Sequence, residues 1–68
     1  MDLRLNDIVR MKKPHPCGSY EWKLLRVGID FRMQCEGCGH TIMLPRTQVE
    51  KRIRKLFRDG AEIPVERN

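Results

Sequence analysis

The 68-residue sequence lacks any long hydrophobic run and contains few aromatic residues. Its longest uninterrupted apolar stretch is Ile42, Met43 and Leu44, whereas a helix needs about 20 apolar residues to cross a bilayer. The amino-terminal residues also lack the basic segment and apolar core of a secretory signal. We therefore expect a cytoplasmic protein without membrane contact. With one Trp, one Tyr and two Phe in the whole chain, extensive recognition by base stacking is not expected either.

The chain is also short. Most domains contain about 100 to 150 residues, so a second domain is not expected. We expect a single domain over residues 1–68, with strands and a metal site in 1–45, a basic helix in 46–59 and a tail in 60–68. Domains this small commonly need a disulfide, a metal or a partner for stability. A deep catalytic cleft does not fit such a domain, so we expect a protein that is not an enzyme.

The three cysteines are odd in number, which leaves at least one outside any disulfide framework, and cytosolic thiols stay reduced. Their spacing favours a structural zinc site instead. Cys35 and Cys38 form a C-x-x-C turn rich in glycine, as in a zinc knuckle. Cys17 lies in an earlier turn that ends in Gly18. Three thiolates are thus available, and tetrahedral zinc requires one further ligand.

The fourth ligand must come from one of the two histidines, His15 or His40. Pro14 and Pro16 restrict the backbone around His15, two residues before Cys17. His40 begins a predicted strand, from which its side chain can point outward. We therefore favour His15 as the fourth ligand of Cys17, Cys35 and Cys38, with His40 as the alternative.

Other interpretations of the cysteines have less support. A thioredoxin-like C-x-x-C begins a helix, whereas Cys35 and Cys38 fall between two predicted strands. Zinc deaminases carry H-x-E and P-C-x-x-C, but here Gln34 precedes Cys35 and the glutamate after the histidine is absent. Four protein ligands would also leave no position for a reactive water. Three unrelated buried thiols are the simplest alternative.

The net charge of +5 comes from one segment. Residues 46–58 hold six basic residues and one acidic residue, and the rest of the chain is balanced. The six are Arg46, Lys51, Arg52, Arg54, Lys55 and Arg58. Such cations repel one another unless a polyanion lies nearby, so the segment predicts nucleic-acid binding. An ordinary solvated helix face is the alternative explanation.

The same segment has the period of an amphipathic helix. Its apolar residues recur at helical spacing, at Val49, Ile53, Leu56 and Phe57. Thr47 and Glu50 fit a capping box at its start, and Gly60 follows its expected end. We therefore expect one helix over residues 46–59.

The rest of the chain predicts short strands. Apolar and polar residues alternate over 29–36, so that Phe31, Met33 and Cys35 share one buried face. The other expected strands are 8–11, 21–27 and 40–44, with an edge segment at 63–65. Four or five short strands cannot hide their edges in a flat sheet. We expect a strand-dominated α+β fold, a curled sheet or small Src-homology-3-like β-barrel with a C-terminal helix and a zinc knuckle.

Three motifs follow one another along the chain, DIVRMKKPHPCG at 7–18, C-x-x-C-G at 35–39 and MLPR at 43–46, with Trp22 between the first two. This series resembles a family of short bacterial proteins classed as a domain of unknown function. The resemblance covers nearly the whole chain and implies a bacterial cytosolic protein with the His-Pro-Cys-Gly motif as its hallmark, which supports His15 as a ligand. Members are often encoded near an Obg-like translation-associated ATPase, which implies a connection with RNA or the ribosome.

We therefore expect a non-enzymatic, zinc-stabilised module that binds nucleic acid, above all structured RNA or the ribosome, mainly through phosphates. The expected contacts are Lys51, Arg52, Arg54, Lys55 and Arg58, extended by Lys12, Lys13 and Arg46. The alternatives are an adaptor that docks an acidic protein partner and a DNA-binding protein.

Overall fold

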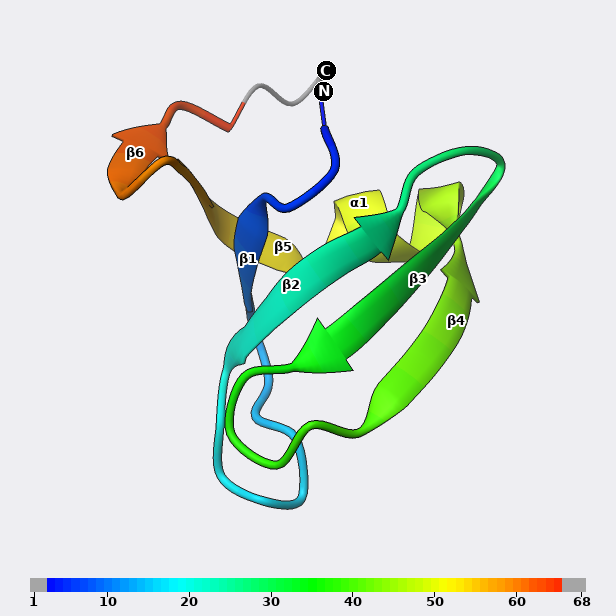
Figure 1. Cartoon of the computed structure of the whole chain (residues 1–68), viewed down its shortest axis with the longest axis vertical. Coiled ribbons are helices and arrows are strands. Elements are labelled where there is room, and N and C mark those ends of the chain that lie inside the picture. The colour runs from blue at the N-terminus through cyan, green and yellow to red at the C-terminus, as the bar shows by residue number, and fades with distance from the viewer. Residues whose placement is uncertain (1–2, 66–68) are drawn as a thin grey trace.

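A computed structural model describes residues 3–65 and shows one curled antiparallel sheet (Figure 1). Its strands are β1 (Ile8–Met11), β2 (Glu21–Arg26), β3 (Asp30–Cys35), β4 (Thr41–Pro45), β5 (Ile53–Arg58) and β6 (Ala61–Ile63). A short helix, α1 (Arg46–Arg52), connects β4 to β5. The strand order is β4-β3-β2-β1-β5-β6, so β5 returns after α1 to pair with β1. The predicted strand-dominated α+β fold is confirmed, with six strands in place of four or five.

The buried side chains follow the alternation seen in the sequence. Those of β3 are Phe31, Met33 and Cys35, which confirms the predicted period of two. Val9 of β1 lies at the centre of the sheet, paired with Trp22 of β2 and Leu56 of β5. Val49 projects from α1 into the same core. One continuous apolar core therefore joins the sheet to the helix.

The predicted helix over residues 46–59 is wrong in its second half. The helix ends at Arg52, and residues 53–58 form β5, which pairs with β1 on one side and β6 on the other. The predicted capping box is also wrong. Pro45 occupies the N-cap without a side-chain cap, and Glu50 instead accepts a hydrogen bond from Arg46 Nε at 3.3 Å.

A bulge explains why β5 looks helical in the sequence. Met11 of β1 pairs with Ile53 and Arg10 pairs with Lys55, which leaves Arg54 without a counterpart. Two consecutive exposed residues, Arg54 and Lys55, therefore separate the buried Ile53 and Leu56. A bulged strand with this i, i+3 spacing produces the same apolar period as a helix.

The sheet stays open at its edges. Among the described residues no pairing joins β4 to β5 or β6, so the structure takes the curled-sheet form of the prediction. The tail contributes β6, in which Ile63 pairs with Leu56, and Val65 packs against the core. The remainder of the predicted tail, residues 66–68, lies outside the described residues.

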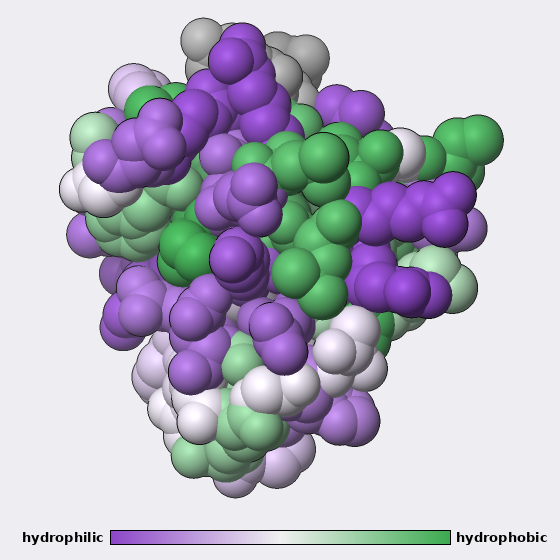
Figure 2. Space-filling model, viewed as in Figure 1, coloured by the Kyte–Doolittle hydropathy of each residue, from purple (hydrophilic) through white to green (hydrophobic). Residues whose placement is uncertain are grey.

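Part of the surface is apolar. Hydrophobic surface gathers toward the end of the molecule that carries the β2–β3 turn (Figure 2), and Leu25, Ile29 and Met43 are the exposed hydrophobic residues of β2, that turn and β4. Within residues 3–65 no helix has the length and hydrophobicity needed to cross a lipid bilayer.

Candidate metal centre

Two loops lie side by side at the end of the molecule drawn lowest in Figure 1, one between β1 and β2 and one between β3 and β4. In the first loop, His15 N–H donates to Ser19 O at 2.8 Å and Gly18 N–H donates to His15 O at 2.7 Å. Gly18 has a φ of 96°, which only glycine adopts at little cost. This tight turn places His15 and Cys17 on the side that faces the second loop.

The second loop is a compact turn around Cys35. Cys35 N–H donates to His40 O at 2.8 Å, and Gly39 N–H donates to Cys35 O at 2.9 Å. Gly39 has a φ of 78°, again in the region that favours glycine. The turn brings Cys38 back over Cys35, as expected for a knuckle formed by C-x-x-C-G.

The two loops touch at Gly37. A Cβ atom at Gly37 would lie 2.6 Å from Ser19 Cβ and 3.2 Å from Cys17 Sγ. Because real Cβ atoms do not approach other atoms this closely, only glycine allows the loops to meet at their present distance. The glycine of the C-x-x-C motif is therefore required for contact between the loops as well as for the turn.

Four potential ligands converge where the loops meet. The donor atoms of His15, Cys17, Cys35 and Cys38 all lie within 4.8 Å of one another. Cys17 Sγ lies 3.4 Å from Cys35 Sγ, and His15 Nδ1 lies 3.1 Å from Cys17 Sγ and 3.6 Å from Cys38 Sγ. Zn–S bonds of about 2.3 Å in a tetrahedral site separate two sulfur atoms by about 3.8 Å. The cluster is close to this spacing and could hold a metal ion.

Backbone amides favour the thiolate form of Cys35. Burial acts to raise the pKa of the Cys35 thiol, but hydrogen bonds from the backbone N–H groups of Cys38 and Gly37 and from the other thiols lower it to about 7. At Cys17 the backbone N–H of Ser19 lowers the pKa, but desolvation and the neighbouring sulfur atoms outweigh it, so the net direction is upward. Crowded sulfur atoms thus resist holding several negative charges together, a cost that a bound cation removes.

The structure brings His15 rather than His40 into this cluster. His40 lies outside it and stacks on the His15 ring, with centroids 5.6 Å apart and planes 24° apart. Trp22 contacts the His15 ring edge-on, with 5.0 Å between the two ring centroids. The two aromatic neighbours hold the His15 ring with Nδ1 directed at the sulfur atoms.

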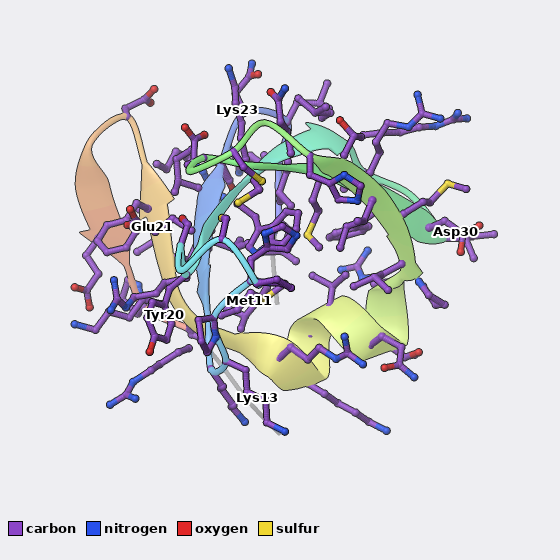
Figure 3. The ribbon with its side chains drawn as sticks, turned by 90° about the horizontal axis from the view of Figure 1, so that it is seen from below. Met11, Lys13, Tyr20, Glu21, Lys23 and Asp30 are labelled. Carbon is purple, nitrogen blue, oxygen red and sulfur yellow. The ribbon has the colours of Figure 1, made fainter. Side chains whose placement is uncertain are left out.

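Several of the predicted nucleic-acid contacts line two adjoining hollows beside the metal centre. Lys12 N–H donates to Arg52 O at 2.9 Å, which joins the end of β1 to the end of α1. The first hollow, of about 560 Å³, has Lys12, Lys13, Lys51 and Arg52 among its lining residues. In Figure 3 Met11 lies toward the middle of this region and Lys13 projects at its rim beside α1.

The second hollow, of about 450 Å³, shares Met11 and Lys12 with the first. It is lined further by Arg10, Tyr20, Arg54, Lys55 and Phe57. The Arg10 guanidinium lies 4.8 Å from the centre of the Tyr20 ring. Arg10 and Tyr20 were not among the predicted contacts, because long-range pairing places them here. Arg10 is the cross-strand partner of Lys55, and Tyr20 O accepts a hydrogen bond from Met11 N–H at 2.9 Å.

Two other predicted contacts are engaged within the fold. Arg58 donates from Nε to Asp7 Oδ1 at 3.0 Å and from an Nη to Asp7 Oδ2 at 2.8 Å. Asp7 is 2% exposed, so this ion pair belongs to the interior. Arg46 binds Glu50 and lies 5.8 Å from the Phe31 ring centre. Neither arginine lines the two hollows, and nucleic-acid contact by Arg46 or Arg58 stays a prediction.

Residues 3–57 match the sequence profile of a family described as "bacterial protein of unknown function (DUF951)". The chain belongs to this family. It is also 54% identical over 56 residues to the uncharacterized protein YyzM of Bacillus subtilis (strain 168), an alignment that covers 82% of each chain. No solved structure matches the chain. The matched region contains all four residues of the metal cluster and both hollows.

Proposed function

We propose that this family member is a non-enzymatic, zinc-stabilised module of the cytoplasm that binds structured RNA through the two adjoining hollows. The observation that carries the proposal is their lining. Seven cationic side chains line them, Arg10, Lys12, Lys13, Lys51, Arg52, Arg54 and Lys55. None of the lining residues, all within the described part of the chain, is acidic. A polyanion is the partner that such a surface fits.

Zinc is the metal that the donor set favours. Three thiolates and one imidazole form a soft, tetrahedral set typical of structural zinc, whereas calcium and magnesium require oxygen ligands. His15, Cys17, Cys35 and Cys38 supply four ligands, which closes the site to a reactive water. The proposed role of the metal is therefore to hold the two loops together, and with them Lys12 and Lys13, which follow β1 at the start of the first loop.

The pairing of β1 with β5 adds support for a polyanion. Arg10 and Lys55 are direct cross-strand partners on the outer face of the sheet, an arrangement that is unfavourable in isolation. Glu21 lies opposite Arg10, and Glu62 lies 3.9 Å from Lys55. The Lys55–Glu62 pair offsets little of the repulsion, because its side chains are 48% and 58% exposed. Phosphates placed over the second hollow would neutralise the remaining repulsion.

A direct test compares two triple variants with the same change in net charge. In the first, Arg10→Ala, Arg54→Ala and Lys55→Ala remove cations of the second hollow. In the control, Lys23→Ala, Arg26→Ala and Arg32→Ala remove cations that line neither hollow. Binding to a fluorescent, structured RNA is measured by anisotropy at several salt concentrations.

We expect the first variant to bind roughly 30-fold more weakly and to lose about two to three units of the salt slope, because each lost phosphate contact releases one counterion fewer. The control should change affinity less than about threefold. Equal losses in both variants would contradict the assignment to the hollows. Absence of RNA binding by the zinc-loaded wild-type chain would reject the proposed function and favour an acidic protein partner.

A further inference from the structure

The first hollow has a different character from the second, although both carry a cationic rim. Its lining includes Trp22, Ile42 and Leu44, which also pack on the core, and the exposed ring of His40. Its volume of about 560 Å³ is that of a site for a small organic group. The apolar lining residues gain nothing from contact with phosphates alone. The cationic and apolar residues together therefore fit a ligand that is anionic and also has a flat or apolar part.

We propose that the first hollow binds the base of one unpaired nucleotide of the RNA strand, while the phosphates on either side lie on the rim and in the second hollow. This inference rests on the proposed function and specifies it. Lys51 and Arg52 border the hollow on the side of α1, and Lys12 belongs to both hollows. A strand that follows the cations therefore passes directly over the opening of the apolar hollow.

His40 provides the stacking surface. Its ring is exposed and is held against His15, which in turn contacts Trp22, so three aromatic rings form a rigid group beside the hollow. A base can stack on a ring that is already fixed with a smaller loss of side-chain entropy than on a mobile one. The proposed role of His40 is therefore to stack on the base, and not to bind the metal.

Two oligomers with the same number of phosphates, one with bases and one without, distinguish binding of a base from binding of the charged backbone. The probes are a short single-stranded oligoribonucleotide and an abasic oligomer of the same length, each titrated into the zinc-loaded full chain. Two measurements are made, the dissociation constant and the ¹H shifts of the Ile42 and Leu44 methyl groups. A free mononucleotide serves as a third ligand, which tests whether the site accepts a nucleotide outside a strand.

We expect the oligoribonucleotide to bind about tenfold more tightly than the abasic strand, which corresponds to one base stacked on an aromatic group. It should also cause ring-current shifts at the Ile42 and Leu44 methyls that the abasic strand does not cause. His40→Ala should abolish the preference while leaving abasic binding and zinc content unchanged. Arg26→Ala, a surface substitution away from both hollows, should change neither affinity.

Equal affinities without ring-current shifts would overturn the inference while leaving the proposed RNA function intact. A mononucleotide that binds as tightly as the oligoribonucleotide would also overturn it, because the hollow would then serve a free nucleotide. If neither oligomer binds a chain that does bind the structured RNA, the inference fails and the proposed function stands. If the chain binds neither the oligomers nor the structured RNA, the proposed function itself fails. A His40→Ala chain that loses zinc would place His40 in the metal site and likewise contradict the role assigned here.

Discussion

At the scale of single residues, Arg58 forms an ion pair with the buried Asp7 that stabilises the fold, although its position in a basic segment predicts contact with nucleic acid. The Asp7 carboxylate accepts two hydrogen bonds from the guanidinium and one from Arg4 N–H at 3.0 Å. Burial acts to raise the pKa of Asp7, but the hydrogen bonds from Arg58 and Arg4 and their charges outweigh it and lower the pKa below 3.8. The ion pair ties the turn before β1 to the end of β5.

Asp7→Asn should therefore destabilise the fold by roughly 2–4 kcal/mol, because it leaves the Arg58 guanidinium partly buried without its counter-charge. Asp30→Asn, at an exposed carboxylate, should change stability by less than about 0.5 kcal/mol. Urea unfolding of the three zinc-loaded chains measures these differences. A loss in Asp7→Asn no larger than in the control would contradict the structural role of the pair.

The pH dependence follows from the lowered pKa of Asp7. A carboxyl group whose pKa is depressed by folding contributes its full stabilisation above the unfolded value of 3.8 and loses it as the pH falls toward the folded value. The difference between wild type and Asp7→Asn should thus be constant near neutral pH and shrink below about pH 4. Acid also protonates the cysteine ligands and releases a metal held by them, so the two chains are compared in excess zinc and only at pH values at which both keep the metal and stay folded.

At the scale of elements, the two loops depend on each other. A Cβ at Gly37 would lie 2.6 Å from Ser19 Cβ and 3.2 Å from Cys17 Sγ, so any side chain there must displace Ser19 and crowd the Cys17 sulfur. Gly28, in the β2–β3 turn, has its nearest neighbour at an ordinary 3.8 Å and no positive φ. Gly28→Ala is therefore a suitable control for Gly37→Ala, because the same methyl group is added where nothing obstructs it.

Gly37→Ala should cost about 1–3 kcal/mol through overpacking and should release zinc at a lower chelator concentration than wild type. Gly28→Ala should behave like wild type in both respects. The measurements are thermal unfolding and competition for zinc with a colorimetric chelator. Wild-type zinc retention in Gly37→Ala would show that the loops do not need their close contact.

The strands and the metal cluster could be predicted from the sequence because local spacing determines them. The alternation through Phe31, Met33 and Cys35 allowed only one buried face, and the positions of Cys17, Cys35 and Cys38 indicated convergent turns. The change from helix to strand at Ile53 could not be predicted, since its cause is a bulge against β1, a partner distant in sequence. The ion pair of Arg58 with Asp7 and the pairing of Arg10 with Lys55 could not be predicted either, because each joins residues that are distant in sequence.

At the scale of the whole molecule, charge is unevenly placed. The two adjoining hollows carry cations without acids, while a third hollow of about 310 Å³ has Glu21, Glu36 and Asp59 in its lining and no lysine or arginine. The third hollow shares Phe57 with the second, so the acidic lining adjoins the cationic one. A phosphate chain that extends past the second hollow in this direction would therefore be repelled.

The core of the molecule is small, and the cluster of His15, Cys17, Cys35 and Cys38 lies at its edge. Cys35 is buried among the core residues, whereas Cys17 and Cys38 are exposed. Structural zinc contributes about 10–16 kcal/mol of binding free energy in small finger peptides. A contribution of that order would exceed the usual net stability of a domain of this size. Folding of the chain is therefore expected to depend on the metal.

Metal content and folding, measured together, test this dependence most directly. Native mass spectrometry of the purified full chain should show one zinc ion per molecule. A strong chelator should remove it together with the dispersed amide signals in the ¹H,¹⁵N spectrum, and added zinc should restore both. A chain that contains no zinc, or that keeps its dispersed spectrum after complete removal of the metal, would contradict the account.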